Sequence, residues 1–233
     1  MIKNRFIIPK DGFNMTKESL KQKAYSTIKH KILTCEYMPS SFLNEDLLCE
    51  DLQVSRTPIR DALSRLEQEN LVKIIPKKGL FVAPLSIGEI NMTFEARHLI
   101  EPYIIMNYCA HLPSDTVDKL YLNIKESRES ILNHNYNNVF KLDDEFHRAI
   151  INRCTNRYIL QTYSNVHNQN CRLRILSGRH DDNRLNATID EHIKILDELV
   201  KGDLISACKA TEEHLLNSKS SCFQAFIEGN STF

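Results

Sequence analysis

Four side chains of metal-binding type fall on the predicted inner faces of three helices. Asp143 and His147 are four residues apart, so they share one helix face, and that face is otherwise apolar. His192 and His214 lie among apolar residues on two later helices. Imidazole and carboxylate groups are costly to bury singly, and one shared divalent cation would satisfy all four. Such a set suits Zn, Ni, Co or Mn better than Ca or Mg. For any one of these histidines, a core residue satisfied by a hydrogen bond is the more common case, so the hypothesis depends on the whole set.

A second group of residues is suited to contact DNA. Residues 54–66 read Val-Ser-Arg-Thr-Pro-Ile-Arg-Asp-Ala-Leu-Ser-Arg-Leu. Ser55 or Thr57 is suited to accept a hydrogen bond from a first-turn amide, and Pro58 fits the first helical position. Apolar residues recur at i, i+4 and i+7 from Ile59, so the arginines point away from that face. Guanidinium groups so placed can pair with guanine edges or clamp phosphates in the major groove. The alternative is that the arginines only solvate an exposed helix.

The N-terminal elements that must position this helix have the order of a winged helix-turn-helix domain, predicted for residues 16–84. Residues 1–15 lack periodicity and are interpreted as a flexible arm. The predicted elements are a helix from 16 to near 35, a helix from the cap Asn44 to about 52, the arginine-rich helix to about 69, and two β-like runs at 71–75 and 80–82. The two runs enclose a basic tip, as expected for a wing.

Residues 86–228 predict an antiparallel bundle of about six helices. Ser86 and Glu89 form a capping box after a short linker at 83–85. The predicted helices are approximately 86–111, 114–134, 136–154, 156–177, 187–201 and 203–227. The predicted fold class is therefore mainly α, with an N-terminal winged helix-turn-helix and a C-terminal helical bundle.

Composition and charge agree with two domains of different character. The 233 residues include only 6 Gly and 7 Pro, which favours long helices. Residues 1–85 carry 14 Lys and Arg against 10 Asp and Glu, and the remainder carries 16 against 20, so the basic part suits a polyanionic partner. No segment approaches the roughly 20 apolar residues that span a bilayer. Seven cysteines without a C-x-x-C motif favour reduced thiols in a cytoplasmic protein.

The N-terminal motifs resemble those of the GntR family of bacterial transcription factors. The matching residues are Tyr25-x-x-Ile28-Lys29-x-x-Ile32-Leu33, Pro39, Leu43-Asn44-Glu45, the run 54–63, Leu66-Glu67, Leu71-Val72 and Gly79. The resemblance implies a homodimer on a palindromic double-stranded DNA operator, with the arginine-rich helix in the major groove and the wing tip in the adjacent minor groove. Carried over by position, the DNA contacts are Arg56, Thr57, Arg60, Arg65, Lys78 and Gly79.

The sequence departs from this family at three turns. Gln53, Ser40 and Asn70 stand where the family usually has glycine. If those positions need a positive φ, a non-glycine residue costs about 1 kcal/mol, although asparagine tolerates that conformation.

The C-terminal pattern resembles the FCD effector domain of the FadR branch of the same family. The matching residues are Asp143-x-x-x-His147, Glu191-His192, and His214 after Gly202-Asp203. The resemblance implies that Asp143, His147, His192 and His214 ligate a divalent transition metal (Zn, Ni or Mn), and that this domain binds an effector and dimerises. About six helices, rather than seven, place the chain nearer the vanillate-regulator-like group than the acyl-CoA-binding one.

An inward-facing arginine near the metal predicts a small carboxylate effector. Arg97 occupies a position that often faces the cavity in this family, and Arg172 and Arg174 are further candidates from a middle helix. A metal would take one carboxylate oxygen and a guanidinium the other. The alternative for each arginine is a surface salt bridge.

The favoured function is therefore a DNA-binding regulator whose operator affinity is controlled by a carboxylate at a metal centre. One competing hypothesis is a metal-dependent hydrolase, since His180-Asp181 is an adjacent pair like that of HD-type phosphohydrolases. Another is a regulator that binds its effector without metal. His30, His98, His111, His134, His167 and His180 show no spacing that demands a role, and the cysteines are interpreted as core residues.

Overall fold

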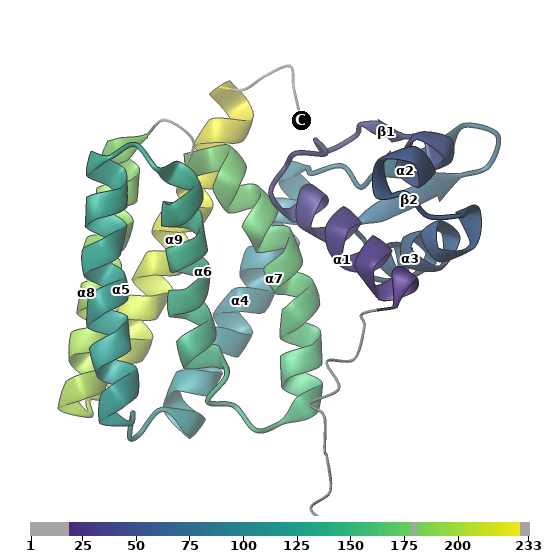
Figure 1. Ribbon diagram of the computed structural model, residues 1–233. Helices are drawn as coiled ribbons and strands as arrows, with labels where there is room; N and C mark the ends of the chain where they lie inside the picture. Colours follow the sequence, from purple (N-terminus) through teal and green to yellow (C-terminus); the bar gives the residue numbers. More distant parts are fainter. Residues whose placement is uncertain (1–18, 179–180, 229–233) are drawn as a thin grey trace, which may run out of the picture.

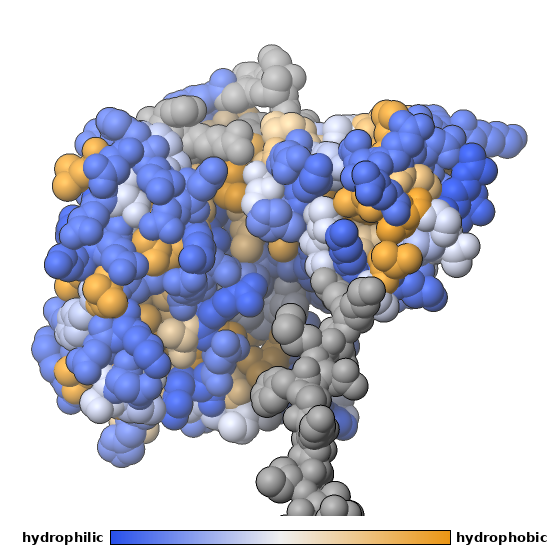
Figure 2. All heavy atoms as spheres, viewed as in Figure 1, coloured by the Kyte–Doolittle hydropathy of each residue, from blue (hydrophilic) through white to orange (hydrophobic). Residues whose placement is uncertain are grey.

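The computed structural model describes residues 19–178 and 181–228, and within them the chain is mainly α, as predicted (Figure 1). The predicted arm at 1–15 and His180 lie outside the described residues. Two large hydrophobic clusters form, one in the N-terminal part and one in the helical part that follows. Figure 2 shows a mainly hydrophilic face on which hydrophobic residues appear in small separate groups. Among the described residues, no helix combines the length and apolar character needed to cross a lipid bilayer.

The N-terminal part is a winged helix-turn-helix. Its elements are α1 (Leu20–Leu33), β1 (Phe42–Leu43), α2 (Glu45–Leu52), α3 (Arg56–Gln68), β2 (Val72–Ile75) and β3 (Gly79–Val82). The sheet is antiparallel with the order β1-β3-β2, and β2 and β3 form the predicted wing hairpin. Strand β1 was not predicted because two residues are too short to show an alternating pattern. Ile28, Ile59 and Leu66 are fully buried in the core, so the apolar face of α3 packs as its periodicity predicted.

The two helix starts in the DNA-binding part differ in how well they were predicted. Asn44 caps α2 as predicted, since its Oδ1 accepts hydrogen bonds from the amides of Asp46 at 2.8 Å and Leu47 at 3.3 Å. Ser55 precedes α3 but makes no side-chain capping bond. Pro58 is the third residue of α3, so its predicted place as the first was wrong. Its missing N–H still costs nothing, because the first four amides of a helix have no helical partner.

All three turn positions that lack the family's glycine adopt left-handed backbone. The φ angles are 65° at Ser40, 53° at Gln53 and 56° at Asn70. The turn between α2 and α3 therefore keeps a glycine-like geometry with a glutamine in place. An L-residue in this region carries a strain of about 1–2 kcal/mol, which asparagine relieves better than glutamine does.

The C-terminal part consists, among the described residues, of the six helices predicted. They are α4 (Ile87–Tyr108), α5 (Ser114–Leu132), α6 (Tyr136–Ile151), α7 (Arg157–Gly178), α8 (Asp182–Lys201) and α9 (Leu204–Glu228). Ser86 caps α4 as predicted, with its Oγ 3.1 Å from the Glu89 amide. Helix α8 begins five residues earlier than predicted, because Asp181 caps it by accepting a hydrogen bond from the Arg184 amide at 2.9 Å.

Helix α7 packs against both parts of the molecule and lies beside α1 of the winged domain (Figure 1). Toward the winged domain, Asn168 donates to a Glu69 carboxylate oxygen at 3.2 Å and Gln169 donates to the Asn70 carbonyl at 3.0 Å. Asn170 and Arg174 point to a different side of α7 and face the interior of the bundle. The two faces of one helix thus contact two different domains.

Candidate functional site

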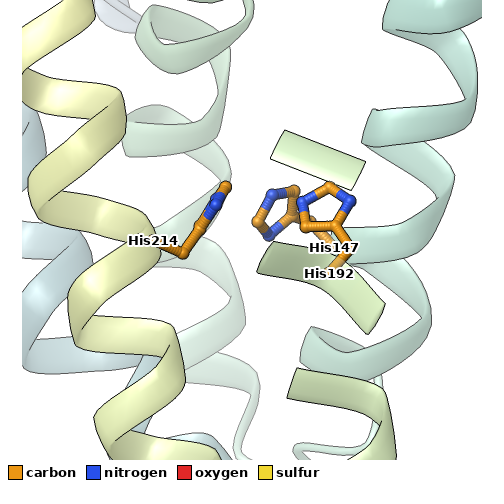
Figure 3. Close-up of side chains that lie close together, drawn as sticks. All are labelled: His147, His192 and His214. Carbon is orange, nitrogen blue, oxygen red and sulfur yellow. The ribbon is translucent and has the colours of Figure 1, made fainter. Parts of the chain in front are cut away.

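Three buried histidines converge between α6, α8 and α9. His147, His192 and His214 each offer a ring nitrogen, and these nitrogens lie within 4.8 Å of one another. The ring centroids are 4.9 to 5.2 Å apart, and Figure 3 shows the imidazoles turned toward a common point. Phe146 stacks on the His192 ring with a centroid distance of 4.0 Å, which fixes that ring in place. The inner-face positions predicted from the sequence are therefore brought together.

A carboxylate behind the His214 ring orients its Nε2 atom inward, and a second carboxylate lies near the His147 ring. His214 Nδ1 lies 2.8 Å from a Glu191 oxygen, and His147 Nδ1 lies 3.6 Å from a Glu101 oxygen. Burial would raise the pKa of Glu191, but its bonds to His214 and Arg184 hold it down to about 2. A carboxylate at Nδ1 is the usual partner of a metal-binding histidine, because it fixes the tautomer that leaves Nε2 free.

Burial disfavours the charged form of two of these imidazoles, which is the form that cannot bind a metal. Burial lowers the pKa of His192 to about 3. Burial, followed by the charge of Arg97, holds the pKa of His147 well below its usual value. The Nε2 atom of His192 is buried and has no hydrogen-bond partner among the described residues. An unpaired buried nitrogen is costly unless something binds it, so the donor set fits a divalent metal.

Asp143 lies beside the histidines but is shared with an arginine. Its Oδ1 is 3.7 Å from His192 Nε2, and its Oδ2 is 3.9 Å from His147 Nε2. Ligands of one tetrahedral zinc ion are about 3.3 Å apart. Asp143 lies outside the group whose ligand atoms are all within 4.8 Å of one another, so it would have to move toward the histidines to become a fourth ligand. Arg174 donates to Oδ2, which leaves Oδ1 for a metal. Burial would raise the pKa of Asp143, but Arg174 and His192 keep it low, so the group is a carboxylate.

A cavity of about 60 Å³ opens onto this cluster, which gives room for a few water-sized groups. Arg97 lines it and is 2% exposed. Its Nε donates to Glu101 at 2.6 Å and its Nη1 to Asn170 at 2.8 Å. Its Nη2 is buried without a hydrogen-bond partner among the described residues, so one donor remains for a ligand. Hydroxyl groups also line the cavity, from Ser127, Ser177, Thr188, Ser218 and Ser221.

The structure places Arg172 away from this cavity, contrary to its prediction as an effector contact. Arg172 donates to the Ala83 carbonyl in the linker and, at 2.8 Å, to Gln169. Burial lowers its pKa to about 10. Arg174, two residues further along α7, lines the cavity instead. Two residues turn an α-helix by about 200°, so only one of this pair can face the bundle interior.

The predicted DNA contacts lie on the winged domain, far from the histidines in the chain. Arg56, Thr57 and Arg60 are exposed on the first turns of α3. Arg56 pairs with Asp46 at 2.8 Å and Arg60 with Glu45 at 3.0 Å, so α2 supplies a carboxylate to each recognition arginine.

The other predicted DNA contacts have additional structural partners. Arg65 stacks 3.7 Å above the Tyr25 ring and donates to Gln22. Lys78 is exposed in the wing tip. Gly79 has φ +110°, and a Cβ there would lie 2.6 Å from the Phe42 ring, so this glycine is required by the wing fold itself.

Sequence reasoning missed several residues that support the site. Glu191 orients His214, and Glu101 lies near His147. Asn170 and Tyr163 hold the Arg97–Glu101 pair. Glu101 had a signal, since it follows Arg97 at i+4 on the same helix face. The partners on α7 had none, because their contacts depend on how the bundle packs. For the hydrolase hypothesis, the structure gives Asp181 a different role, since it serves as the cap of α8.

A winged helix-turn-helix joined to an all-helical domain defines a class of DNA-binding transcription factors. Comparison with known families agrees with this class. The model of the "Bacterial regulatory proteins, gntR family" matches residues 20–82, and that of the FCD domain matches residues 92–217. The chain belongs to the GntR family of transcriptional regulators, with an FCD domain, and this family consists of DNA-binding regulators rather than enzymes.

Relatives along nearly the full length carry the same description. The chain is 24% identical over 216 residues to the HTH-type transcriptional repressor RspR of Escherichia coli, covering 93% of this chain and 94% of that protein. It is 28% identical over 192 residues to an HTH-type regulator of Streptomyces ambofaciens, covering 82% and 80%. Its fold is similar to that of a GntR regulator from Rhodococcus sp. RHA1, with a TM-score of 0.76 at 18% identity over 88% of this chain and 97% of that one. An FCD domain described as metal-free is similar at a TM-score of 0.52 and 19% identity, covering 63% and 99%.

Proposed function

We propose that this regulator binds its operator as a homodimer and changes its operator affinity when a small carboxylate binds at a metal centre in the FCD domain. The observation that carries this proposal is that two polar groups lining one cavity both lack a hydrogen-bond partner among the described residues. His192 Nε2 and Arg97 Nη2 are both buried, and neither has a hydrogen-bond partner among the described residues. A cation would bind the first group, and an anion the second.

His147, His192 and His214 would hold the metal through Nε2, and Asp143 through Oδ1. A bound Zn, Ni or Mn ion would supply a positive charge. The four protein ligands would leave a position open for the effector if the ion takes five or six ligands. Arg174 would keep its hold on Oδ2 of Asp143 and so orient that ligand.

The carboxylate would be recognised from two sides. One of its oxygens would bind at the open position of the metal, and Arg97 Nη2 would donate to the other. The Glu101 carboxylate accepts a hydrogen bond from Arg97 Nε, which holds the guanidinium in place and offsets its positive charge. Arg97 alone would therefore attract anions weakly, and an anion would bind well only if it also reached the metal. The serine and threonine hydroxyls of the cavity wall would select among small carboxylates.

Helix α7 supports a link between this cavity and DNA binding. Asn170 and Arg174 contact cavity residues, and Gln169 and Arg172 contact the winged domain and the linker. An effector that shifts α7 would therefore alter the placement of the winged domain, and by linkage operator binding would alter effector affinity by the same factor.

An exposed apolar stripe on α4 supports the homodimer. Met92, Leu99, Tyr103 and Met106 recur on one face of this helix and are 43 to 72% exposed. A second copy of the chain could cover the stripe with its own, which is the self-complementary arrangement of a twofold interface. We expect Leu99→Glu to yield monomers in sedimentation, while Leu132→Glu, at a 78% exposed site on α5, leaves the oligomer unchanged.

The DNA-binding half of the proposal is tested with operator fragments selected from genomic DNA. The variant with Arg56→Ala and Arg60→Ala should lose sequence-specific binding and keep its metal content. Lys209→Ala, on α9, is a control that removes a positive charge outside the winged domain. Unchanged operator affinity in the double variant would refute the assignment of α3.

The effector half is tested by thermal shift with a panel of small mono- and dicarboxylates, with and without metal. We expect stabilisation by at least one carboxylate in metal-loaded protein, lost in Arg97→Met. The metal-free alternative predicts the same stabilisation after chelation. Less than about 0.2 equivalent of transition metal in protein purified without chelator would favour that alternative over a site of structural-zinc affinity.

A further inference from the structure

A second group of metal-binding side chains lies on the other side of Asp143, between α6 and α7. Asp144, His167 and Cys171 each offer one ligand atom, and these atoms lie within 4.8 Å of one another. His167 and Cys171 are four residues apart on α7 and therefore share a face. The sequence alone indicated no role for either residue, because the third member of the group, Asp144, comes from another helix. This group shares no ligand with the histidine cluster.

The spacing of these three atoms resembles the edges of a zinc coordination sphere. His167 Nε2 is 3.4 Å from Cys171 Sγ, and Sγ is 3.7 Å from Asp144 Oδ1. Zinc bonds of about 2.0 Å to nitrogen or oxygen and about 2.3 Å to sulfur place tetrahedral ligands about 3.3 to 3.5 Å apart. The third edge, from His167 Nε2 to Asp144 Oδ1, is 2.6 Å because a proton bridges the two atoms. A metal ion would replace that proton and open this edge.

The charges around the cluster also fit a cation bound by a thiolate. Arg148 donates to Oδ2 of Asp144 at 2.7 Å, which leaves Oδ1 for the ion. Arg174 Nη2 lies 3.7 Å from Cys171 Sγ and 3.8 Å from Asp144 Oδ1. A divalent ion bound by one thiolate and one carboxylate is neutral overall. Binding the ion therefore adds no positive charge that would repel the two neighbouring guanidinium groups. The bound ion would displace one proton from the Cys171 thiol and one from His167.

Access to the cluster is open on one side. His167 and Cys171 are buried, whereas the side chain of Asp144 is 23% exposed and that of Arg148 is 57% exposed. An ion can therefore enter past Asp144. Three protein ligands leave the fourth position of a tetrahedral ion to water, as in zinc sites that are not purely structural.

We propose that Asp144, His167 and Cys171 form a second, sulfur-containing site for a thiophilic divalent cation such as zinc. The site is separate from the histidine centre, which offers only nitrogen and oxygen ligands. Arg174 lies between the two, since it contacts Asp143 on one side and Cys171 and Asp144 on the other. The two sites would thus be neighbours joined by one guanidinium.

Cobalt(II) distinguishes the two sites in the full-length protein, because only a cysteine ligand gives a near-ultraviolet thiolate-to-cobalt charge-transfer band. Reduced, metal-free protein titrated with Co²⁺ should develop this band together with a second bound equivalent. Cys171→Ser should lose both and keep the first equivalent. Cys222→Ser, at the cysteine that lines the histidine cavity, is the matched control and should keep the band.

His147→Ala separates this proposal from the proposed function, since it should remove the first equivalent and leave the charge-transfer band intact. The absence of the band in saturated wild-type protein would overturn the second site, whatever the histidine centre does. A band that survives Cys171→Ser would overturn it as well.

Alkylation of wild-type protein gives a test that needs no variant. Zinc should slow iodoacetamide labelling of Cys171 at least tenfold, as measured by peptide mass spectrometry. Cys49, in the winged domain, should be labelled at the same rate with and without zinc. Equal labelling of Cys171 under both conditions would contradict the proposal.

Discussion

The bond between Glu191 and His214 provides the sharpest test of the proposed histidine metal centre. Glu191→Gln keeps the size of the side chain and an oxygen acceptor for His214 Nδ1, but removes the negative charge. The present bond is short, 2.8 Å, and charge-assisted. Hydrogen bonds to a charged group contribute about 1.5–3 kcal/mol, and neutral ones about 0.5–1.5 kcal/mol. The substitution should therefore cost about 1–1.5 kcal/mol at the metal-bound imidazole, which corresponds to about a tenfold loss of metal affinity.

The assay is a competition titration of zinc between the protein and a chromophoric chelator. Glu213→Gln is the matched control, because it makes the same change beside His214 on an exposed side chain paired with Lys194. The control should bind zinc as the wild type does. Glu191→Ala should lose up to about 100-fold, since it also removes the group that orients the ring. If the Glu191→Gln protein binds zinc as tightly as the control does, then Glu191 does not support His214 as a zinc ligand. That result would refute the proposed role of this bond.

Three further predictions follow from other parts of the molecule. Gln53→Gly should raise the free energy of unfolding in urea by about 0.5–1 kcal/mol, because glycine relieves left-handed strain at some entropic cost; a decrease would show that the glutamine side chain stabilises the turn. Asp46→Asn should raise affinity for non-specific duplex DNA several-fold at low salt, by freeing Arg56, whereas Asp51→Asn at the other end of α2 should change it less. Removing metal with a chelator should lower the midpoint of thermal unfolding, since a ligand at 100 times its Kd stabilises by about 2.7 kcal/mol; the protein with His147→Ala should show no such shift.

Most of the fold was predictable because its signals are local. Caps at Asn44 and Ser86 and the apolar periodicity of α3 placed helices correctly. The errors also have local causes. Strand β1 is too short for a pattern, and the polar run at the start of α8 gave no sign that Asp181 begins a helix there.

The candidate site was only partly predictable. Inner-face positions indicated the three histidines, since an imidazole among apolar residues on a helix must find a partner. The choice between Arg172 and Arg174 could not be made in this way, because both lie in a helix that contacts protein on two sides. The carboxylates beside the histidines come from other helices or other turns, so their contacts depend on tertiary packing.

The two-sided contacts of α7 limit how this protein can change in length. Inserting one residue in the middle of the helix would rotate everything after it by about 100°. Arg172 would leave the linker carbonyl and Arg174 would leave Asp143 in the same step. The helix itself therefore cannot absorb an insertion. Evolution can replace individual residues along α7, whereas the number of residues between Tyr163 and Arg174 has to stay fixed.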